Sequence, residues 1–391
     1  MRILFYRYGS ICEPDYSEAF RKLDIDIVEI TEEVTNKELK PSEVTKLVSD
    51  ALFGGGYDAV FTINFYPVIS AVCQVFQLRY ICQTVDSPVH ELYAEQMAND
   101  WNRVFLFCMD QYRQFAEVNP GRIFHLPLAT NPERWQSVIV GASDEEKDRF
   151  RSEVSFVGSL YTEKNPYTEY DGRDPYLAGY LEGAMQAQLR VYGFHFLDEI
   201  ITDEITERFR QAVPTFYTPP EAYHMPDKEI LIRHYMDAEI SVKERIAVCR
   251  RIGEKSGLTL YTASDTTGLP VDNRGTVKTL TEMPLVFSQS RINLNPTTKG
   301  IREGLSLRIF DVLGCGGFLI TNYQAELGEW FEPGVDLEVY GSLDELEDKV
   351  EYYLSHEEER AQIARNGLEK VRQYHNYTER VLQMLELAFS V

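Results

Sequence analysis

Short apolar runs alternate with amphipathic stretches over the first 130 residues of the chain. The runs have the length and composition of buried strands, whereas the apolar residues between them recur with a helical period. The predicted strands are residues 2–6, 25–30, 58–63, 80–83, 103–108 and 122–126. The predicted helices are residues 14–23, 41–53, 67–77, 90–99 and 110–118. Regular alternation of strand and helix predicts a doubly wound parallel sheet.

A second alternating pattern begins with the apolar run at Val154. Its further predicted strands are residues 258–262, 291–295 and 318–321, and the capping box Ser342-Leu-Asp-Glu345 predicts a helix start. Long helical patterns around a proline-rich break interrupt this rhythm over residues 165–250. We therefore expect an α/β protein with two facing, doubly wound, Rossmann-like domains and a helical insertion in the second.

The same patterns predict the domain boundaries. The first domain is expected over residues 1–135 and the second over residues 153–375, with the insertion at about 165–250. The polar residues 136–152 between them are typical of a linker. Residues 376–391 are expected to form a terminal helix that could pack back on the first domain.

Charge and hydropathy narrow the class of protein. The chain has 62 acidic and 39 basic side chains, a formal net charge of -23, and this argues against nucleic-acid binding, which needs a clustered basic surface. The uncharged stretch 59–78 is interrupted by Asn64 and Pro67, which favours a buried strand and a helix over stable membrane insertion. The amino-terminal residues lack the pattern of a signal peptide, so we expect a cytoplasmic protein. Six scattered cysteines without a C-x-x-C pair argue against a disulfide framework or a zinc site.

The densest group of candidate site residues follows the predicted strand that ends at Asn295. Glu303 and Gly304 come directly before a helix that is expected to open at Ser306. The free N–H groups and positive dipole end of such a helix favour a bound phosphate. Arg308 and Asp311 are three residues apart on that helix, so they either pair with each other or bind a diphosphate and a ribose. The spacing alone does not choose between the two.

This stretch resembles the signature of one enzyme family. Glu303-x7-Asp311 is similar to the Glu-x7-Glu motif of GT-B fold group 1 glycosyltransferases. Leu307-Arg-Ile-Phe-Asp311 with Gly316-Gly-Phe318 is similar to the spore-maturation-protein-like branch of these transferases. Cys82-Gln-Thr-Val-Asp86 and Leu126-Pro-Leu-Ala129 resemble the amino-terminal domain associated with that branch.

The resemblance implies transfer of a sugar from a nucleoside-diphosphate sugar, a UDP-sugar by preference, to an unknown carbohydrate or glycoconjugate acceptor, in the cleft between the domains. It implies no cofactor and no metal. Asp311, one methylene shorter than the family's glutamate, would hold the ribose hydroxyls, and Glu303 would lie near the donor sugar. The other implied donor-site residues are Gly158, Ser159, Lys164, Asn295, Gly304, Leu305 and Ser306, with Arg308 as the preferred counter-charge to the diphosphate.

Acceptor activation is expected from the first domain. Asp86 follows a predicted strand and His90 opens the next helix, and both residue types act as general bases. Asp86 could equally be a turn or capping carboxylate, and His90 a surface histidine. If the reaction retains anomeric configuration, no protein base is needed and Asp86 would bind the acceptor. Asp24-Ile-Asp26, an Asp-x-Asp sequence, lies where alternation predicts a strand with its polar face outward, which argues against metal binding.

Two further functions stay open at this stage. A nucleotide-sugar epimerase on the same fold would need no acceptor, and a non-catalytic two-lobed protein would only bind its ligand. The insertion would serve either as an acceptor platform or as a contact between two copies of the chain.

Overall fold

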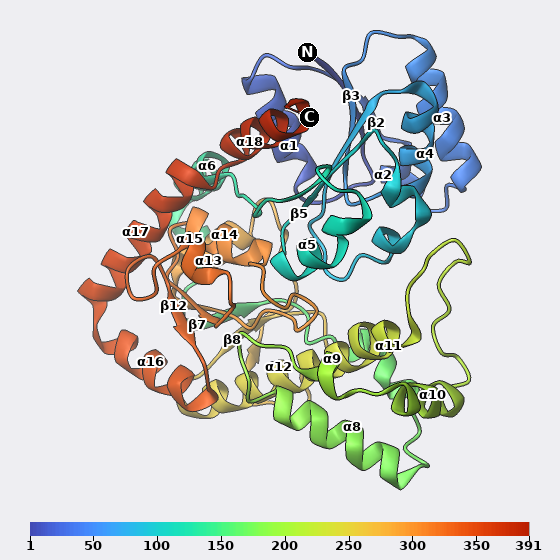
Figure 1. Cartoon of the computed structure of the whole chain (residues 1–391). Coiled ribbons are helices and arrows are strands. Elements are labelled where there is room, and N and C mark those ends of the chain that lie inside the picture. Colours follow the sequence, from blue (N-terminus) through green and yellow to red (C-terminus); the bar gives the residue numbers. More distant parts are fainter. Residues whose placement is uncertain (391) are drawn as a thin grey trace. The chain divides into compact units, whose positions relative to one another are not determined.

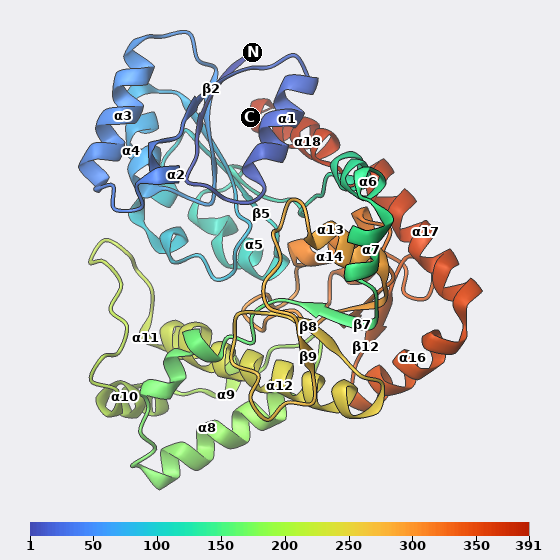
Figure 2. The same cartoon turned by 180° about the vertical axis from the view of Figure 1, so that it is seen from behind.

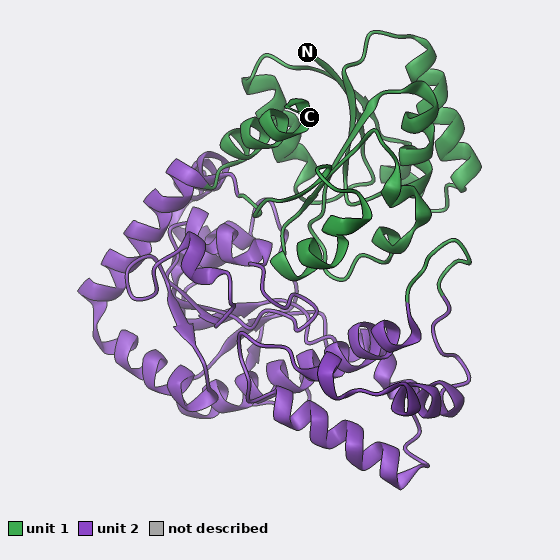
Figure 3. Ribbon diagram, viewed as in Figure 1, with its two compact units in different colours: residues 1–129, 219–225, 375–391 green, residues 130–218, 226–374 purple. Residues whose placement is uncertain are grey.

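The computed structural model describes residues 1–390 and divides into two compact units (Figures 1 and 3). Unit 1 comprises Met1–Ala129, Pro219–Met225 and the carboxy-terminal stretch from His375. Unit 2 comprises Thr130–Thr218 and Pro226–Tyr374. The chain therefore leaves unit 2 within the insertion, adds a short segment to unit 1 and returns.

Unit 1 is built on a six-stranded parallel sheet in the order β2-β1-β3-β4-β5-β6. Its strands are β1 (Arg2–Tyr6), β2 (Asp26–Ile30), β3 (Ala59–Ile63), β4 (Arg79–Gln83), β5 (Asn102–Leu106) and β6 (Ile123–His125). All five residues of β3 are buried, because this central strand is covered on both faces. The predicted strands of this domain are thus present, each within a few residues of its expected bounds.

Helices cover both faces of this sheet. α3 (Pro41–Phe53) and α4 (Pro67–Phe76) pack one face, and the uncharged stretch 59–78 thereby becomes β3 and α4. α1 (Glu13–Lys22) and the carboxy-terminal α18 (Tyr377–Phe389) pack the other and lie side by side in both views (Figures 1 and 2). The remaining helical segments are α2 (Glu32–Thr35), α5 (Met109–Phe115) and the 3-10 turn η3 (Ala116–Val118).

Residues 90–99 differ from the expected helix. They form two 3-10 turns, η1 (His90–Tyr93) and η2 (Glu95–Ala98), separated by an extended Ala94. Ala94 pairs with Tyr223 in an antiparallel bridge, and the Glu95 N–H donates to the Ala222 carbonyl at 3.3 Å. This long-range pairing, which local periodicity cannot signal, breaks the helix and binds the segment Pro219–Met225 to unit 1.

Unit 2 is built on a second six-stranded parallel sheet in the order β12-β11-β10-β7-β8-β9. Its strands are β7 (Ser152–Val157), β8 (Thr259–Tyr261), β9 (Asp272–Asn273), β10 (Ser290–Asn295), β11 (Leu319–Asn322) and β12 (Glu338–Tyr340). The chain runs outward from β7 to β9 and then returns to place β10 on the other side of β7. The carboxyl ends of β7 and β10 therefore form the topological switch point of this sheet, where ligands of doubly wound folds bind.

The residues expected to be a linker, 136–152, are instead largely helical. They lie in unit 2 and contain most of α6 (Pro132–Gly141) and α7 (Asp144–Arg149). Asn131 caps α6, and a capping box of Ser143 and Glu146 starts α7. The polar residues that suggest a linker are thus helix-capping residues and exposed faces.

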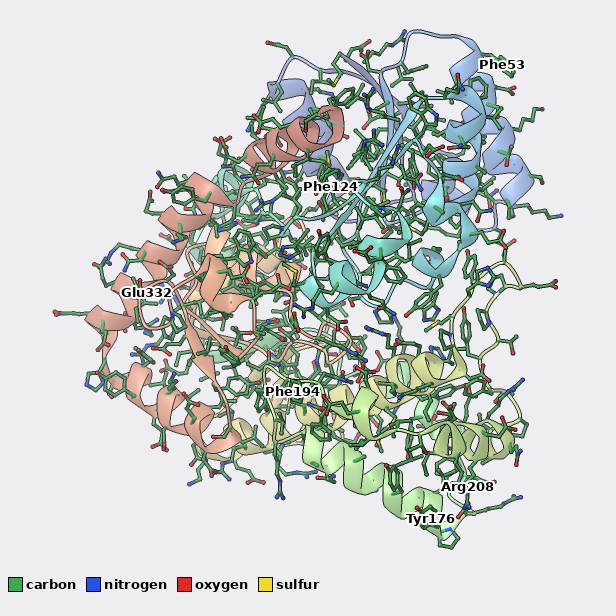
Figure 4. All side chains as sticks on the ribbon, in the orientation of Figure 1. Phe53, Phe124, Tyr176, Phe194, Arg208 and Glu332 are labelled. Carbon is green, nitrogen blue, oxygen red and sulfur yellow. The ribbon has the colours of Figure 1, made fainter. Side chains whose placement is uncertain are left out.

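The insertion is helical as predicted (Figure 1). It contains η4 (Thr162–Lys164), η5 (Pro166–Glu169), α8 (Pro175–Gln188), α9 (Leu197–Ile200), α10 (Asp203–Ala212), α11 (Asp227–Glu229), the π-helical turn η6 (Ile230–Met236) and α12 (Asp237–Lys255). The second half of α12 enters the core under the sheet through Val248, Cys249 and Ile252, and Tyr192 packs against that core. On the surface of the insertion, the Arg208 guanidinium lies 5.3 Å from the ring centre of the exposed Tyr176 (Figure 4).

The rest of unit 2 comprises α13 (Met283–Gln289), α14 (Leu307–Gly314), α15 (Leu327–Trp330), α16 (Leu343–Ser355) and α17 (Glu357–Tyr374). Within residues 1–390, no helix combines the length and the apolar character that crossing a bilayer requires. All six cysteines are buried.

Candidate functional site

Arg245 lies at the switch point of unit 2. Its guanidinium donates to the carbonyl of Ser159, in the loop after β7, and to the carbonyl of Pro296, in the loop after β10, at 3.0 Å for the latter. The side chain is 8% exposed, and its charged carbon lies 4.4 Å from the ring centre of Tyr161. One buried cation from α12 therefore joins the two loops that diverge at this point.

Asn295 connects the end of β10 to the start of α14. Its side-chain amide donates to the hydroxyls of Thr297 at 2.9 Å, Thr321 at 3.0 Å and Ser306 at 3.3 Å. Ser306 is the N-cap of α14, but its side chain accepts no hydrogen bond from the first turn. The Ser306 carbonyl accepts from the Ile309 N–H at 3.0 Å, so the first-turn N–H groups that are not bonded to the cap are those of Leu307 and Arg308, and such groups suit anion binding.

Glu303 and Gly304 lead into this helix as predicted. The Glu303 carbonyl accepts from the Glu326 N–H at 3.2 Å, and Leu305 is buried. After β7, the Gly158 N–H donates to the Tyr261 carbonyl at 3.1 Å, and the Ser159 hydroxyl donates to Glu163 at 2.8 Å. The structure therefore brings Gly158 and Ser159 to the same end of the sheet as Asn295.

The two predicted charges of α14 have separate partners. Asp311 is buried and accepts from the Thr130 hydroxyl at 2.9 Å, and Thr130 in turn accepts from the indole N–H of Trp135 at 2.7 Å. Arg308 donates to the sulfur of Met283 and lies 5.2 Å from the ring centre of Phe287. Arg308 and Asp311 thus each contact another side chain, and their binding of a diphosphate and a ribose stays a prediction.

Two cations of this site lack an ion-pair partner within residues 1–390. Burial lowers the pKa of the Arg308 guanidinium, the nearby Asp311 carboxylate partly offsets this, and the charge of Arg245 lowers it further. Burial also lowers the pKa of Arg245. Each guanidinium therefore lies in surroundings that disfavour its charge, which a bound anion would offset.

The other cations of the region are already compensated or exposed. Lys299 forms an ion pair with the buried Glu244 at 3.2 Å, and Arg302 forms one with Asp198. Lys164 ends η4 on the surface. Arg308, the cation preferred from the sequence, thus stays the candidate counter-charge, and Arg245 is a second candidate.

Unit 1 has a polar cluster at its own switch point, between β1 and β3. Asn64 follows β3 in a left-handed conformation (φ 57°), and its side-chain amide donates to Asp86 at 2.7 Å and to the Tyr8 hydroxyl at 3.2 Å. Its oxygen accepts from the Val85 N–H at 3.0 Å. Asp86 is exposed, and the N-cap of the following turn is Val89, so Asp86 is not the capping residue of η1.

His90 opens η1 in unit 1 and is partly buried. Burial lowers its pKa below the ordinary value, and Glu91 offsets this only in part. The imidazole is therefore neutral at neutral pH, the form in which it can accept a proton.

Arg245 and Asn64 are candidate site residues that sequence reasoning missed. Asn64 had a usable signal, because it is a polar residue directly after a buried strand of a parallel sheet. Arg245 lies in a helix rich in charged residues, where a charge normally faces solvent, and no local pattern marks it as buried.

The Asp-x-Asp sequence lies outside these clusters. Asp24 precedes the strand with φ 55°, and Asp26 begins β2 and pairs with Arg2 at 3.0 Å. The part of the chain that the structure describes contains no group of three or more His, Cys, Asp or Glu side chains able to hold a metal ion.

Comparison with known proteins agrees with this architecture. Residues 245–386 match the family model described as "Glycosyl transferase-like", and the match begins at Arg245. No curated protein matches the chain.

Solved structures similar to the whole chain include a glycosyltransferase from Rickettsia africae (TM-score 0.53, 10% identity, 100% of this chain and 98% of that one). Anabaena Alr3699/HepE in complex with UDP has a TM-score of 0.52 and 12% identity, with 100% of both chains covered. Sucrose-phosphate synthase from Thermosynechococcus elongatus has a TM-score of 0.55 and 11% identity, with 99% and 98% covered. The predicted α/β fold of two doubly wound parallel sheets is thereby confirmed, as is its match to glycosyltransferases of GT-B fold.

Proposed function

We propose that this chain is a glycosyltransferase that moves a sugar from a UDP-sugar to a carbohydrate or glycoconjugate acceptor. The observation that carries the proposal is the pair of guanidiniums, Arg245 and Arg308, without ion-pair partners at the switch point of unit 2. In a chain of net charge -23, the buried Arg245 and the half-buried Arg308 favour a ligand with concentrated negative charge, and a diphosphate has it.

The chemistry of glycosyl transfer suits these residues. Breaking the bond between the anomeric carbon and the diphosphate builds negative charge on the leaving oxygen. The Arg308 guanidinium and the first-turn N–H groups of α14 are preorganised donors for that charge, so we propose that the reaction needs no metal ion. Asp311, held by Thr130, would accept hydrogen bonds from the ribose hydroxyls, and Glu303 would contact the donor sugar.

Unit 1 would supply the acceptor side of the reaction. Asp86 with Asn64, or the neutral His90, would take the proton of the acceptor hydroxyl if configuration inverts. If configuration is retained, Asp86 would bind the acceptor instead. The match of residues 245–386 to a glycosyl transferase-like family, and UDP in a solved structure of similar fold, support the proposal.

Product analysis tests this function. The full chain would be incubated with UDP-glucose, UDP-galactose or UDP-N-acetylglucosamine, a mixed pool of sugar and sugar-phosphate acceptors, and EDTA, and the products read by mass spectrometry. We expect UDP and a glycosylated acceptor, both lost in Arg308→Gln and kept in Arg365→Gln, a change at an exposed arginine of α17. An altered free sugar with UDP and no acceptor product would indicate an epimerase, and binding without turnover would indicate a binding protein.

A further inference from the structure

The loop between β10 and α14 is bound along its length to one face of α12. The anchoring residues of α12 are Asp237, Ser241 and Glu244, whose spacing of four and three places them on the same face of the helix, and Arg245 beside them. The loop runs from Pro296 to the N-cap Ser306 and includes Glu303, the residue assigned above to the donor sugar. Its attachment therefore decides where that carboxylate lies.

The central contacts use hydroxyls and one ion pair. The Ser241 hydroxyl accepts from the Lys299 N–H at 3.0 Å and lies 2.9 Å from the Thr298 hydroxyl. The Lys299 ammonium pairs with Glu244 at 3.2 Å, with both side chains at most 9% exposed. Arg245 holds the start of the loop through the Pro296 carbonyl.

The end of the loop is held by a cluster of four charged side chains, of which three are buried and the fourth, Asp198, is 37% exposed. Arg302 pairs with Asp198 of α9, and its Nε lies 3.9 Å from Asp237 Oδ2. His195 lies between the same two carboxylates, with Nε2 at 2.7 Å from Asp237 and Nδ1 at 3.6 Å from Asp198. The side chains of Arg302, Asp237 and His195 are 4%, 1% and 8% exposed.

We infer that His195 is a positioning residue for the donor site: its protonated imidazole completes the cluster of charges that fixes Arg302 and thereby Glu303. The inference rests on the proposed function and assigns a role to the insertion, which contributes both His195 and Asp198. With His195 protonated, two positive charges face two negative ones. With His195 neutral, the cluster carries an uncompensated negative charge one residue from Glu303.

The charged groups facing His195 come from three elements: Asp237 of α12, Asp198 of α9 and Arg302 of the loop. Lys228 adds a contact to the Asp198 carbonyl at 2.7 Å.

Burial lowers the pKa of His195, but the two carboxylates raise it more, so the net pKa lies above the ordinary value. A raised histidine pKa stabilises the folded state at low pH, and this stabilisation is lost as pH rises through the folded value. Burial raises the pKa of Asp198, but His195 and Arg302 lower it more, so the net pKa lies below the ordinary value. The contribution of Asp198 to folding stability is therefore lost only in acid.

The test compares His195→Gln with His356→Gln, a matched change at an exposed histidine of unit 2. Hydrogen–deuterium exchange of the full chain reports the order of residues 296–306 without any ligand. Calorimetry with UDP and with UDP-glucose separates the diphosphate contacts, which His195 does not position, from the sugar contact, which it does. Both measurements are made from pH 5.5 to pH 9.

We expect faster exchange over residues 296–306 in His195→Gln only. We also expect the preference for UDP-glucose over UDP, or the turnover of UDP-glucose, to fall about tenfold, since small misplacements of a contact group have effects of this size. In the wild-type chain the preference should decline as pH rises, and in His195→Gln it should be flat.

Unchanged exchange over residues 296–306 would overturn the inference, as would faster exchange with an unchanged preference for UDP-glucose. A wild-type chain that binds no nucleoside diphosphate at all would contradict the proposed function itself. The role of His195 would then fall with it, and the two failures are told apart by this one control.

Discussion

At the scale of single residues, Arg308 gives the most direct test of diphosphate binding. Its guanidinium has no carboxylate partner in an ion pair, and burial and Arg245 both lower its pKa. Removing it should therefore weaken diphosphate binding without leaving another charge unpaired. We expect Arg308→Gln to weaken UDP binding by about 2 kcal/mol, the value of a hydrogen bond to a charged group, measured by calorimetry.

Two further variants make that prediction specific. Arg308→Lys should restore part of the affinity, since it keeps the charge but not the planar fork. Arg365→Gln should bind UDP as the wild-type chain does. Equal UDP affinity in Arg308→Gln and the wild-type chain would show that Arg308 does not contact the diphosphate.

Asp311 should set the preference for ribose over deoxyribose. Its carboxylate is oriented by Thr130 and Trp135, which gives a hydroxyl-bearing sugar a fixed acceptor. We expect the wild-type chain to bind UDP more tightly than 2′-deoxy-UDP by about 1 kcal/mol, and Asp311→Asn to reduce this difference. A competition assay with the two nucleotides measures it, and an unchanged ratio in Asp311→Asn would contradict the assignment.

At the scale of elements, the close packing of α17 depends on one glycine. A Cβ on Gly367 would meet the Asp336 carbonyl oxygen and the Leu313 side chain closer than van der Waals contact allows. A Cβ on Gly183, in the middle of α8, would meet nothing within 4 Å. Both glycines have ordinary helical backbone angles. The two positions therefore differ in the room for a side chain and not in backbone strain.

Alanine at these two positions should therefore have opposite effects. We expect Gly367→Ala to lower the free energy of unfolding by about 2 kcal/mol through overpacking. Gly183→Ala should raise it by about 0.5–1 kcal/mol, because alanine is the better helix former. Urea titration of both variants measures the difference, and a neutral Gly367→Ala would mean that α17 can move away from Asp336.

The elements show which parts of the fold the sequence can predict. Strands such as residues 2–6 and 59–63 are apolar runs with clear ends, and their pattern is sufficient. Residues 90–99 do not form the predicted helix, because a long-range bridge to Tyr223 interrupts it. Residues 136–152 are helical and not the predicted linker, because their polar residues cap α6 and α7 and cover exposed helix faces. In the candidate site, a local motif is sufficient to predict where Glu303 and Ser306 lie relative to α14. The burial of Arg245 depends on tertiary packing, which no local sequence pattern indicates.

At the scale of the whole molecule, unit 1 depends on a helix from the far end of the chain. Tyr377, Val381, Met384 and Ala388 of α18 are buried in the same core as α1 and β1. The Tyr16 and Tyr377 rings lie 4.9 Å apart, and Arg103 donates to the Ala388 carbonyl at 3.1 Å. The first 129 residues therefore do not supply this core alone.

Two adjacent residues of α18 provide the test. Val381 is fully buried and Leu382 is 39% exposed. We expect Val381→Asp to unfold unit 1, because it buries an unpaired charge in the core and removes an apolar side chain worth about 2 kcal/mol, whereas Leu382→Asp should leave it folded. Hydrogen–deuterium exchange in β1 and α1 gives the readout. Native protection of β1 in Val381→Asp would show that unit 1 is stable without this contact.

The central claim is that the switch point of unit 2 binds the diphosphate of a nucleotide sugar. The most direct measurement is calorimetric titration of the full chain with UDP, UMP and uridine, in EDTA and again in magnesium. We predict that UDP binds in EDTA, that affinity falls from UDP to UMP to uridine, and that Arg308→Gln removes most of the difference between UDP and uridine. Equal binding of uridine and UDP, or no binding of UDP, GDP, ADP or dTDP under either condition, would contradict it.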